Sequence, residues 1–117
     1  MTQRFLALGR LKTGQMNKTE QAYAAYLEQR KQAGEVAWYR FEGLKLRLAD
    51  NTFLTPDFVV MLAGGQIEIH DCKGSKAIYT DDAKVKMKVS AELYPFVFRA
   101  VYPRPKRDGG GWIIEEV

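Results

Sequence analysis

The feature that most restricts the fold of this chain is a pair of apolar runs on either side of two glycines. Residues 58–62 (FVVML) and 66–73 (QIEIHDCK) flank Ala63-Gly64-Gly65. Short runs rich in β-branched and aromatic residues on either side of such a turn are typical of antiparallel strands joined by a hairpin. We therefore expect a β-hairpin over residues 58–73.

Helical periodicity predicts one helix before this hairpin and one after it. Residues 17–20 (NKTE) form a capping-box pattern at the start of a helix over about 18–33. The Asp81-Asp82 pair fits the cap of a second helix over about 81–93, in which apolar residues recur at helical spacing. The hairpin therefore lies between two helices in the sequence.

Further strands complete the predicted fold. They are expected over residues 36–41, 44–48, 96–102 and 112–117, and the segment 44–48 alternates strictly between leucine and a cation. Within the hairpin, we interpret Glu68 as a solvated residue and Cys72 as a small buried one. The fold class is α/β with a mixed sheet, in the order helix, strands including a hairpin, helix, strand.

Length and composition fit one compact domain. The chain has 117 residues, of which 46% are hydrophobic and 27% charged, and its net charge of +4 is compatible with a phosphate-rich partner. We interpret residues 1–16 as a basic N-terminal arm and residues 17–117 as a single domain. The only cysteine cannot form an intramolecular disulfide, and no apolar run is long enough for a membrane span or a secretory signal. We therefore expect a cytoplasmic protein.

Charged residues at the ends of the expected hairpin carry the clearest chemical signal. Asp57 precedes the first strand, and Asp71 and Lys73 end the second. Because strand side chains alternate, Asp71 and Lys73 share a face, whereas Cys72 points away. A two-residue turn would pair Asp57 with Cys72 and place it on the wrong face. We therefore predict a three-residue loop, or a bulge, that brings Asp57 onto the face of Asp71.

Two carboxylates and a lysine at one edge of a sheet indicate a divalent-metal site. Converging carboxylates repel each other, and Mg²⁺ or Mn²⁺, which prefer oxygen ligands, relieve this conflict. Such an ion can help to ionise an attacking water and stabilise charge on a phosphate, while Lys73 orients the water or neutralises the phosphate. The backbone carbonyl of Cys72 is a further candidate ligand. The plainer interpretation is a turn at Asp57 and a surface ion pair between Asp71 and Lys73.

The segments TPDF (55–58) and DCKG (71–74), joined by a glycine hairpin, form a motif that also occurs in a known protein family. This pattern resembles the PD-(D/E)xK nucleases, and it is most similar to the phage endonuclease I type of Holliday-junction resolvase and to related small phage proteins. The resemblance covers about residues 17–102. It implies a restriction-endonuclease-like core with the order helix, three strands, helix, strand.

The resemblance also implies roles for individual residues. Asp57 corresponds to the first acidic metal ligand, Asp71 to the second and Lys73 to the motif lysine. Glu20 corresponds to an additional acidic residue that these enzymes bring to the metals, although it also occupies the capping-box position. Endonuclease I has a glutamate at the position of Asp71. The shorter aspartate side chain is permitted by the wider motif. His70 has no role in the motif, and we interpret it as a surface or packing residue.

Basic residues form clusters that could follow a nucleic-acid backbone without reading its sequence. The second helix carries Lys84, Lys86 and Lys88, of which Lys84 and Lys88 share a face and are the candidate phosphate contacts. The other candidates lie after the motif and toward the two termini: Lys76, Arg104, Lys106, Arg107, Arg10 and Lys12. The alternative for each cluster is an ordinary solvated face.

These features together predict a divalent-metal-dependent endodeoxyribonuclease. The resemblance narrows this to a phage resolvase of branched DNA in the cytoplasm of the host cell. Resolution needs two symmetrical cuts, so we expect a homodimer, with the N-terminal arm as a candidate for exchange between protomers. Two alternatives stay open: a non-cleaving DNA-binding accessory protein of recombination or replication on a nuclease fold, and an ordinary α/β domain with charged surface pairs.

Overall fold

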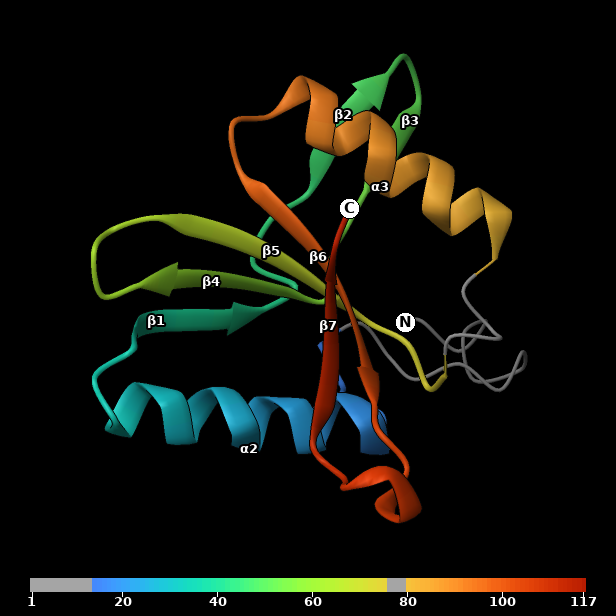
Figure 1. Ribbon diagram of the computed structural model, residues 1–117. Helices are drawn as coiled ribbons and strands as arrows, with labels where there is room; N and C mark the ends of the chain where they lie inside the picture. The colour runs from blue at the N-terminus through green and yellow to red at the C-terminus, as the bar shows by residue number, and fades with distance from the viewer. Residues whose placement is uncertain (1–13, 76–79) are drawn as a thin grey trace.

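The fold is built on a mixed five-stranded β-sheet with one long helix on each face (Figure 1). The computed structural model describes residues 14–75 and 80–117. Its elements are α2 (Lys18–Gln32), β1 (Val36–Phe41), β2 (Leu46–Ala49), β3 (Thr52–Leu54), β4 (Phe58–Leu62), β5 (Ile67–Cys72), α3 (Asp81–Leu93), β6 (Val97–Pro103), the 3-10 turn η2 (Lys106–Asp108) and β7 (Trp112–Glu116). Within the described residues, no helix is long and apolar enough to cross a membrane.

The central sheet has the strand order β1-β4-β5-β6-β7. Three of its neighbouring pairs are antiparallel, whereas β5 and β6 run parallel. A parallel pair requires a crossover connection, and α3 lies in the connection between β5 and β6. These observations confirm the predicted α/β class with a mixed sheet. The parallel pair also brings the C-terminal ends of β5 and β6 to the same edge of the sheet.

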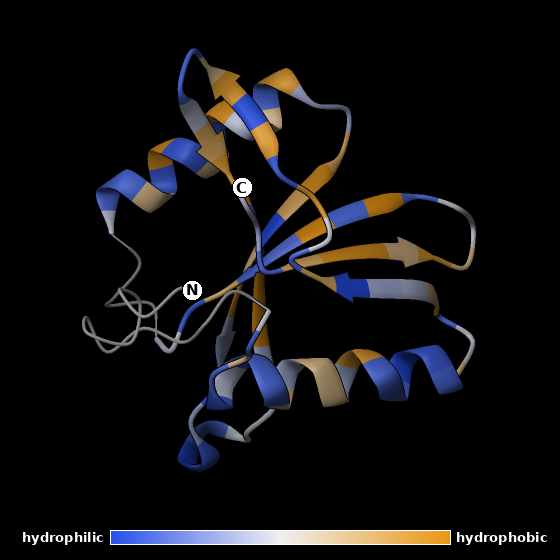
Figure 2. Ribbon diagram, turned by 180° about the vertical axis from the view of Figure 1, so that it is seen from behind, coloured by the Kyte–Doolittle hydropathy of each residue, from blue (hydrophilic) through white to orange (hydrophobic). Residues whose placement is uncertain are grey.

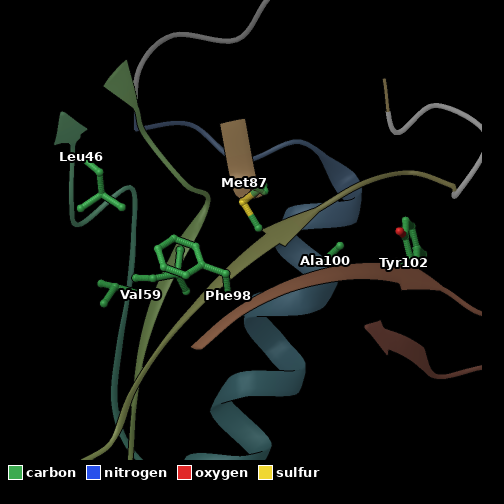
Figure 3. Close-up of a cluster of buried hydrophobic side chains, with 7 residues drawn as sticks. Leu46, Val59, Met87, Phe98, Ala100 and Tyr102 are labelled. Carbon is green, nitrogen blue, oxygen red and sulfur yellow. The ribbon is translucent and has the colours of Figure 1, made fainter. Parts of the chain in front are cut away.

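Side-chain alternation along the strands divides the interior into two cores, one beneath each helix. Strand segments near the centre of the sheet are strongly hydrophobic, as Figure 2 shows. The core toward α2 contains Tyr23, Leu27, Val36, Phe58, Val60, Cys72 and Val101. The core toward α3, of which Figure 3 shows a close-up, contains Leu46, Val59, Ile69, Met87, Phe98, Ala100 and Tyr102. The central strand β5 is therefore covered on both faces, where an unpaired charge is costly.

The two helices begin at different kinds of cap. At α2 the predicted capping box is confirmed, because the Asn17 side chain accepts the Glu20 N–H at 2.8 Å and the Glu20 carboxylate accepts the Asn17 N–H at 2.9 Å. At α3 the predicted aspartate cap is wrong. Thr80 is the N-cap, and its hydroxyl accepts the Ala83 N–H at 3.3 Å. The two aspartates that follow lie in the first turn, where they complement the helix dipole.

The strand expected over residues 44–48 is only partly confirmed. β2 begins at Leu46 and pairs with β3, a strand that was not predicted, in a hairpin separate from the main sheet. Leu46 is buried and Arg47 is exposed, so the predicted alternation holds. A tight turn in which Asn51 has φ 53° joins the two strands. This hairpin packs against α3 rather than extending the sheet.

Candidate active site

The hairpin of β4 and β5 aligns Asp57 with Asp71. Phe58 pairs with His70, and the same register carried one residue further sets the two aspartates opposite each other. The loop between the strands contains three residues, 63–65, and backbone hydrogen bonds between the flanking residues close it. The prediction of an odd-numbered loop is therefore confirmed, and both aspartates belong to the face that α3 covers.

Short polar contacts hold this acidic pair in place. The Asp57 backbone N–H donates to Asp71 Oδ1 at 3.3 Å, and Asp57 Oδ2 accepts the Cys72 backbone N–H at 2.8 Å. Lys73 Nζ lies 2.9 Å from Asp71 Oδ2 and forms an ion pair with it. The Cys72 thiol lies on the opposite face, in the core beneath α2, as the alternation predicted. The Asp71 carboxylate thus has a lysine ammonium beside it, whereas the Asp57 carboxylate has a backbone N–H.

Burial and repulsion shift the protonation of the pair. Asp71 is 6% exposed and Asp57 is half-buried. Burial, together with the charge of Asp71, raises the pKa of Asp57 to about 9, with a smaller contribution from Glu20. In the metal-free protein the Asp57 carboxyl therefore holds a proton at neutral pH. A bound cation would reverse this preference, because it favours the ionised form of both carboxyls.

The acidic pair opens onto a hollow of about 400 Å³ between the strand ends and the N-terminal half of α3. Two of the α3 residues on its wall are charged, Asp82 and Lys86. The complete lining is Leu54, Thr55, Asp57, Asp71, Lys73, Thr80, Asp82, Ala83 and Lys86. Strands from one side and a helix from the other thus enclose a polar space beside the two carboxylates.

Glu20 lies near this hollow but does not line it. Its carboxylate caps α2 through the Asn17 N–H, and its charge contributes to the raised pKa of Asp57. The structure therefore shows the capping role that the sequence left open. A metal-binding role for Glu20 stays a prediction.

The residues present fit a cation held by few protein ligands. Among residues 14–75 and 80–117, no group of three or more histidine, cysteine or acidic side chains is arranged to hold a metal ion. Asp57 and Asp71 supply two carboxylates, and the backbone carbonyl of Cys72 remains the further candidate. Mg²⁺ usually keeps several waters and binds through one or two carboxylates plus phosphate oxygens, so a two-carboxylate site suits it.

The predicted phosphate contacts are spread over different surfaces. Lys84 and Lys88 line another hollow, beside Glu115 and Glu116, and do not face the acidic pair. The exposed loop after β6 follows the C-terminal end of that strand, which lies beside the C-terminal end of β5. It carries Arg104, Lys106 and Arg107. The candidates Lys76, Arg10 and Lys12 lie outside the described residues.

A buried polar network lies on the other face of β5. Tyr23 Oη lies 2.6 Å from His70 Nδ1, and His70 Nε2 lies 2.9 Å from Glu68 Oε1, which also accepts from Arg99 at 3.1 Å. Burial lowers the pKa of His70, while the hydrogen bond from His70 lowers that of Glu68 to about 2. The neutral imidazole therefore donates a hydrogen bond from Nε2 to the Glu68 carboxylate and accepts a hydrogen bond from the Tyr23 hydroxyl at Nδ1.

This network corrects the interpretation of Glu68 as a solvated residue. The Glu68 side chain is only 7% exposed, and that of His70 is 1% exposed. Both residues alternate with the apolar side chains of β5, so each could have been assigned to the α2 face. The sequence carried no signal that Tyr23 and Arg99, from two other elements, would supply their partners.

Comparisons with protein families, curated proteins and solved structures find no match for this chain.

Proposed function

We propose that this protein is a divalent-metal-dependent endodeoxyribonuclease of the PD-(D/E)xK type. One observation carries the proposal: the carboxylates of Asp57 and Asp71 meet at opposite positions of two strands, with the Lys73 ammonium 2.9 Å from Asp71. An acidic pair that is largely removed from solvent is costly unless a cation or a function retains it. Their position beside an open polar hollow favours a functional site over a surface ion pair.

The order of the elements supports the same proposal. α2, β1, β4, β5, α3 and β6 follow the sequence helix, three strands, helix, strand that is expected of a restriction-endonuclease-like core. The β2–β3 hairpin is then an insertion between the first two core strands, and β7 is an addition after the last one. In this scheme the metal ligands and the lysine come from the ends of the second and third core strands.

Each side chain has a distinct task in the proposed reaction. Asp57 and Asp71, with the Cys72 carbonyl, would hold Mg²⁺ or Mn²⁺. A bound ion of this kind supplies Lewis acidity toward a water and a phosphate oxygen. Lys73, held beside the site by Asp71, orients the attacking water or neutralises the phosphate. Glu20 would add negative charge at the start of α2.

Branched DNA is the proposed substrate, and a homodimer is the proposed active form. The exposed basic loop after β6 lies at the same sheet edge as the acidic pair, where it can contact backbone phosphates. Phosphate contacts give affinity without reading bases, which suits recognition of DNA shape. Two symmetrical cuts at a junction require two sites related by a twofold axis.

Cleavage of a labelled four-way junction, beside a linear duplex of matching sequence, tests this proposal. Reactions would contain Mg²⁺, Mn²⁺ or EDTA. We expect paired nicks near the branch that EDTA abolishes. We expect Lys73→Ala and Asp57→Asn to lower the single-turnover rate by about 10²–10³-fold, because the first removes the ammonium that acts on the water or the phosphate and the second removes a proposed metal ligand. Lys31→Ala, an exposed lysine in the last turn of α2, is the matched control and should cut normally.

The outcomes distinguish three parts of the proposal: the nuclease activity, the selectivity for junctions and the location of the site. Metal-dependent cutting of both substrates at equal rates would retain the nuclease and remove the resolvase. Tight junction binding without cutting in any metal would favour the non-cleaving accessory protein. Cutting that survives in Lys73→Ala and Asp57→Asn would place the chemistry elsewhere in the chain.

A further inference from the structure

We infer that Lys86 on α3 is a substrate-binding residue that contacts a DNA phosphate in the hollow beside Asp57 and Asp71. This inference rests on the proposed function and deepens it. It replaces the sequence-based choice of Lys84 and Lys88, which lie two residues away on either side.

Helix geometry separates these three lysines. Successive residues of an α-helix turn by about 100°, so residues two apart point in nearly opposite directions. Lys86 lines the hollow that also contains Asp57, Asp71 and Lys73. Lys84 and Lys88 line the hollow near the C-terminus instead. Only one of the three lysines on α3 therefore faces the acidic pair.

Lys86 is also available to a ligand. Within residues 14–75 and 80–117 it forms no ion pair. The ammonium of Lys73, in contrast, is engaged by Asp71 at 2.9 Å. Lys88 shares its hollow with Glu115 and Glu116, so an approaching phosphate would meet negative charge there. An exposed cation on the wall of a polar hollow, without an ionic partner of its own, is suited to an anionic substrate.

The charge balance of the hollow gives Lys86 a specific part. Its wall carries three carboxylates, Asp57, Asp71 and Asp82, and two ammonium groups, Lys73 and Lys86. With a divalent cation bound and all three carboxylates ionised, the hollow has one net positive charge, which matches a single phosphodiester. Without Lys86 the balance is neutral. The lysine therefore supplies the excess charge that attracts the substrate once the metal ligands are satisfied.

Binding and cleavage by Lys86→Gln test the inference, with Lys88→Gln as the matched control on the same helix. Affinity for a labelled junction and duplex would be measured in Ca²⁺ over a series of NaCl concentrations, and kcat/KM in Mn²⁺. We expect Lys86→Gln to weaken binding about 3–10-fold and to reduce the slope of log K against log salt by about 0.9, as for one lost phosphate contact. Lys86→Arg should restore both, and Lys88→Gln should resemble wild type.

Failure of the inference is distinguishable from failure of the proposed function. Equal losses in Lys86→Gln and Lys88→Gln, or no loss in either, would overturn the inference, even if wild type cuts DNA in a metal-dependent manner. A wild type that binds DNA but cuts none, with a loss confined to Lys86→Gln, would remove the nuclease and keep the contact. No DNA binding by wild type would overturn both. Both lysines are exposed, and circular dichroism would verify that the variants are folded.

Discussion

The acidic pair concentrates the electrostatic cost of the fold in two residues. Asp57 and Asp71 lie opposite each other at the ends of covered strands, and among residues 14–75 and 80–117 only Asp71 has a lysine partner at ion-pair distance. The Asp57 carboxyl accepts one backbone N–H, which does not offset its burial and the neighbouring charge. The metal-free protein therefore retains a proton at this position. The proposed metal binding and the stability of the metal-free fold therefore make opposite demands on Asp57.

Asp57 should make the metal-free protein less stable as the pH rises. Its pKa is raised to about 9 in the folded state, whereas in the unfolded chain it ionises near pH 4. Between these values the unfolded state binds fewer protons, so this contribution to folding stability falls as the pH increases and levels off above about pH 9. Asp57→Asn resembles the protonated side chain and removes this dependence. We expect the variant to be more stable than wild type at pH 8 by about 1–3 kcal/mol.

Urea unfolding in EDTA from pH 4 to 9 would measure this effect. The difference between the two proteins should shrink toward pH 4, where the Asp57 carboxyl is protonated in the folded state and about half protonated in the unfolded state. Asp50→Asn, at an exposed turn, is the control and should follow wild type at every pH. Parallel curves for wild type and Asp57→Asn would contradict the raised pKa.

At the scale of elements, the length of one loop decides which face of the sheet carries the site. The three-residue loop between β4 and β5 sets Asp57 opposite Asp71. Gly65 has φ 92° within it, a conformation that glycine adopts without strain. Because strand side chains alternate, a loop one residue shorter would turn Asp57 toward α2. The proposed active site thus depends on the number of residues in this loop as much as on its own residues.

Deleting Gly64 should therefore abolish metal-dependent cleavage. The shorter loop pairs Asp57 with Cys72 and moves the apolar residues of one strand to the wrong core, so we also expect a loss of at least about 2 kcal/mol in unfolding free energy. Single-turnover cleavage and urea unfolding would measure the two effects. Gly64→Ala is the control, since a Cβ at this position meets no atom within 4 Å. A deletion variant that still cuts DNA would show that the register does not control the site.

At the scale of the whole molecule, the sheet brings segments that are distant in the sequence together at the C-terminal ends of β5 and β6. The parallel pairing of β5 and β6 ends both strands together, so the acidic pair and the basic loop after β6 lie at the same edge. α3 lies over one face of the sheet, and residues of its N-terminal half line one side of the hollow. The network of Tyr23, His70, Glu68 and Arg99 links α2, β5 and β6 from the other face. The site is thereby supported by both layers.

Metal binding should stabilise the whole fold through the acidic pair. A ligand that binds only the folded state adds about 2.7 kcal/mol when its concentration is a hundred times its Kd. We expect Mn²⁺ to raise the Tm of wild type in a concentration-dependent manner, as measured by differential scanning calorimetry. Asp57→Asn should lose most of this increase, whereas Asp50→Asn should retain it. A shift that is equal in all three proteins would reflect ion binding outside the proposed site.

Local patterns in the sequence determined most of the elements. The capping box of α2 and the extent of α3 depend on residues within a few turns of each other, so periodicity and capping patterns predicted them. The three-residue loop between β4 and β5 was predicted instead from the requirement that Asp57 join the face of Asp71. The alternation of Asp71 and Lys73 likewise followed from strand geometry. The cap of α3 was predicted wrongly because Thr80 and the two following aspartates are competing local signals.

Only the tertiary structure decided which neighbours these elements meet. The packing of the β2–β3 hairpin against α3, the burial of Glu68 and the position of Lys86 beside the acidic pair all depend on segments far apart in the chain. Glu68 looks solvated until Arg99 and His70 are placed beside it. Sequence periodicity states which residues share a face, but it does not state what covers that face, and the covering element determines burial, charge and access.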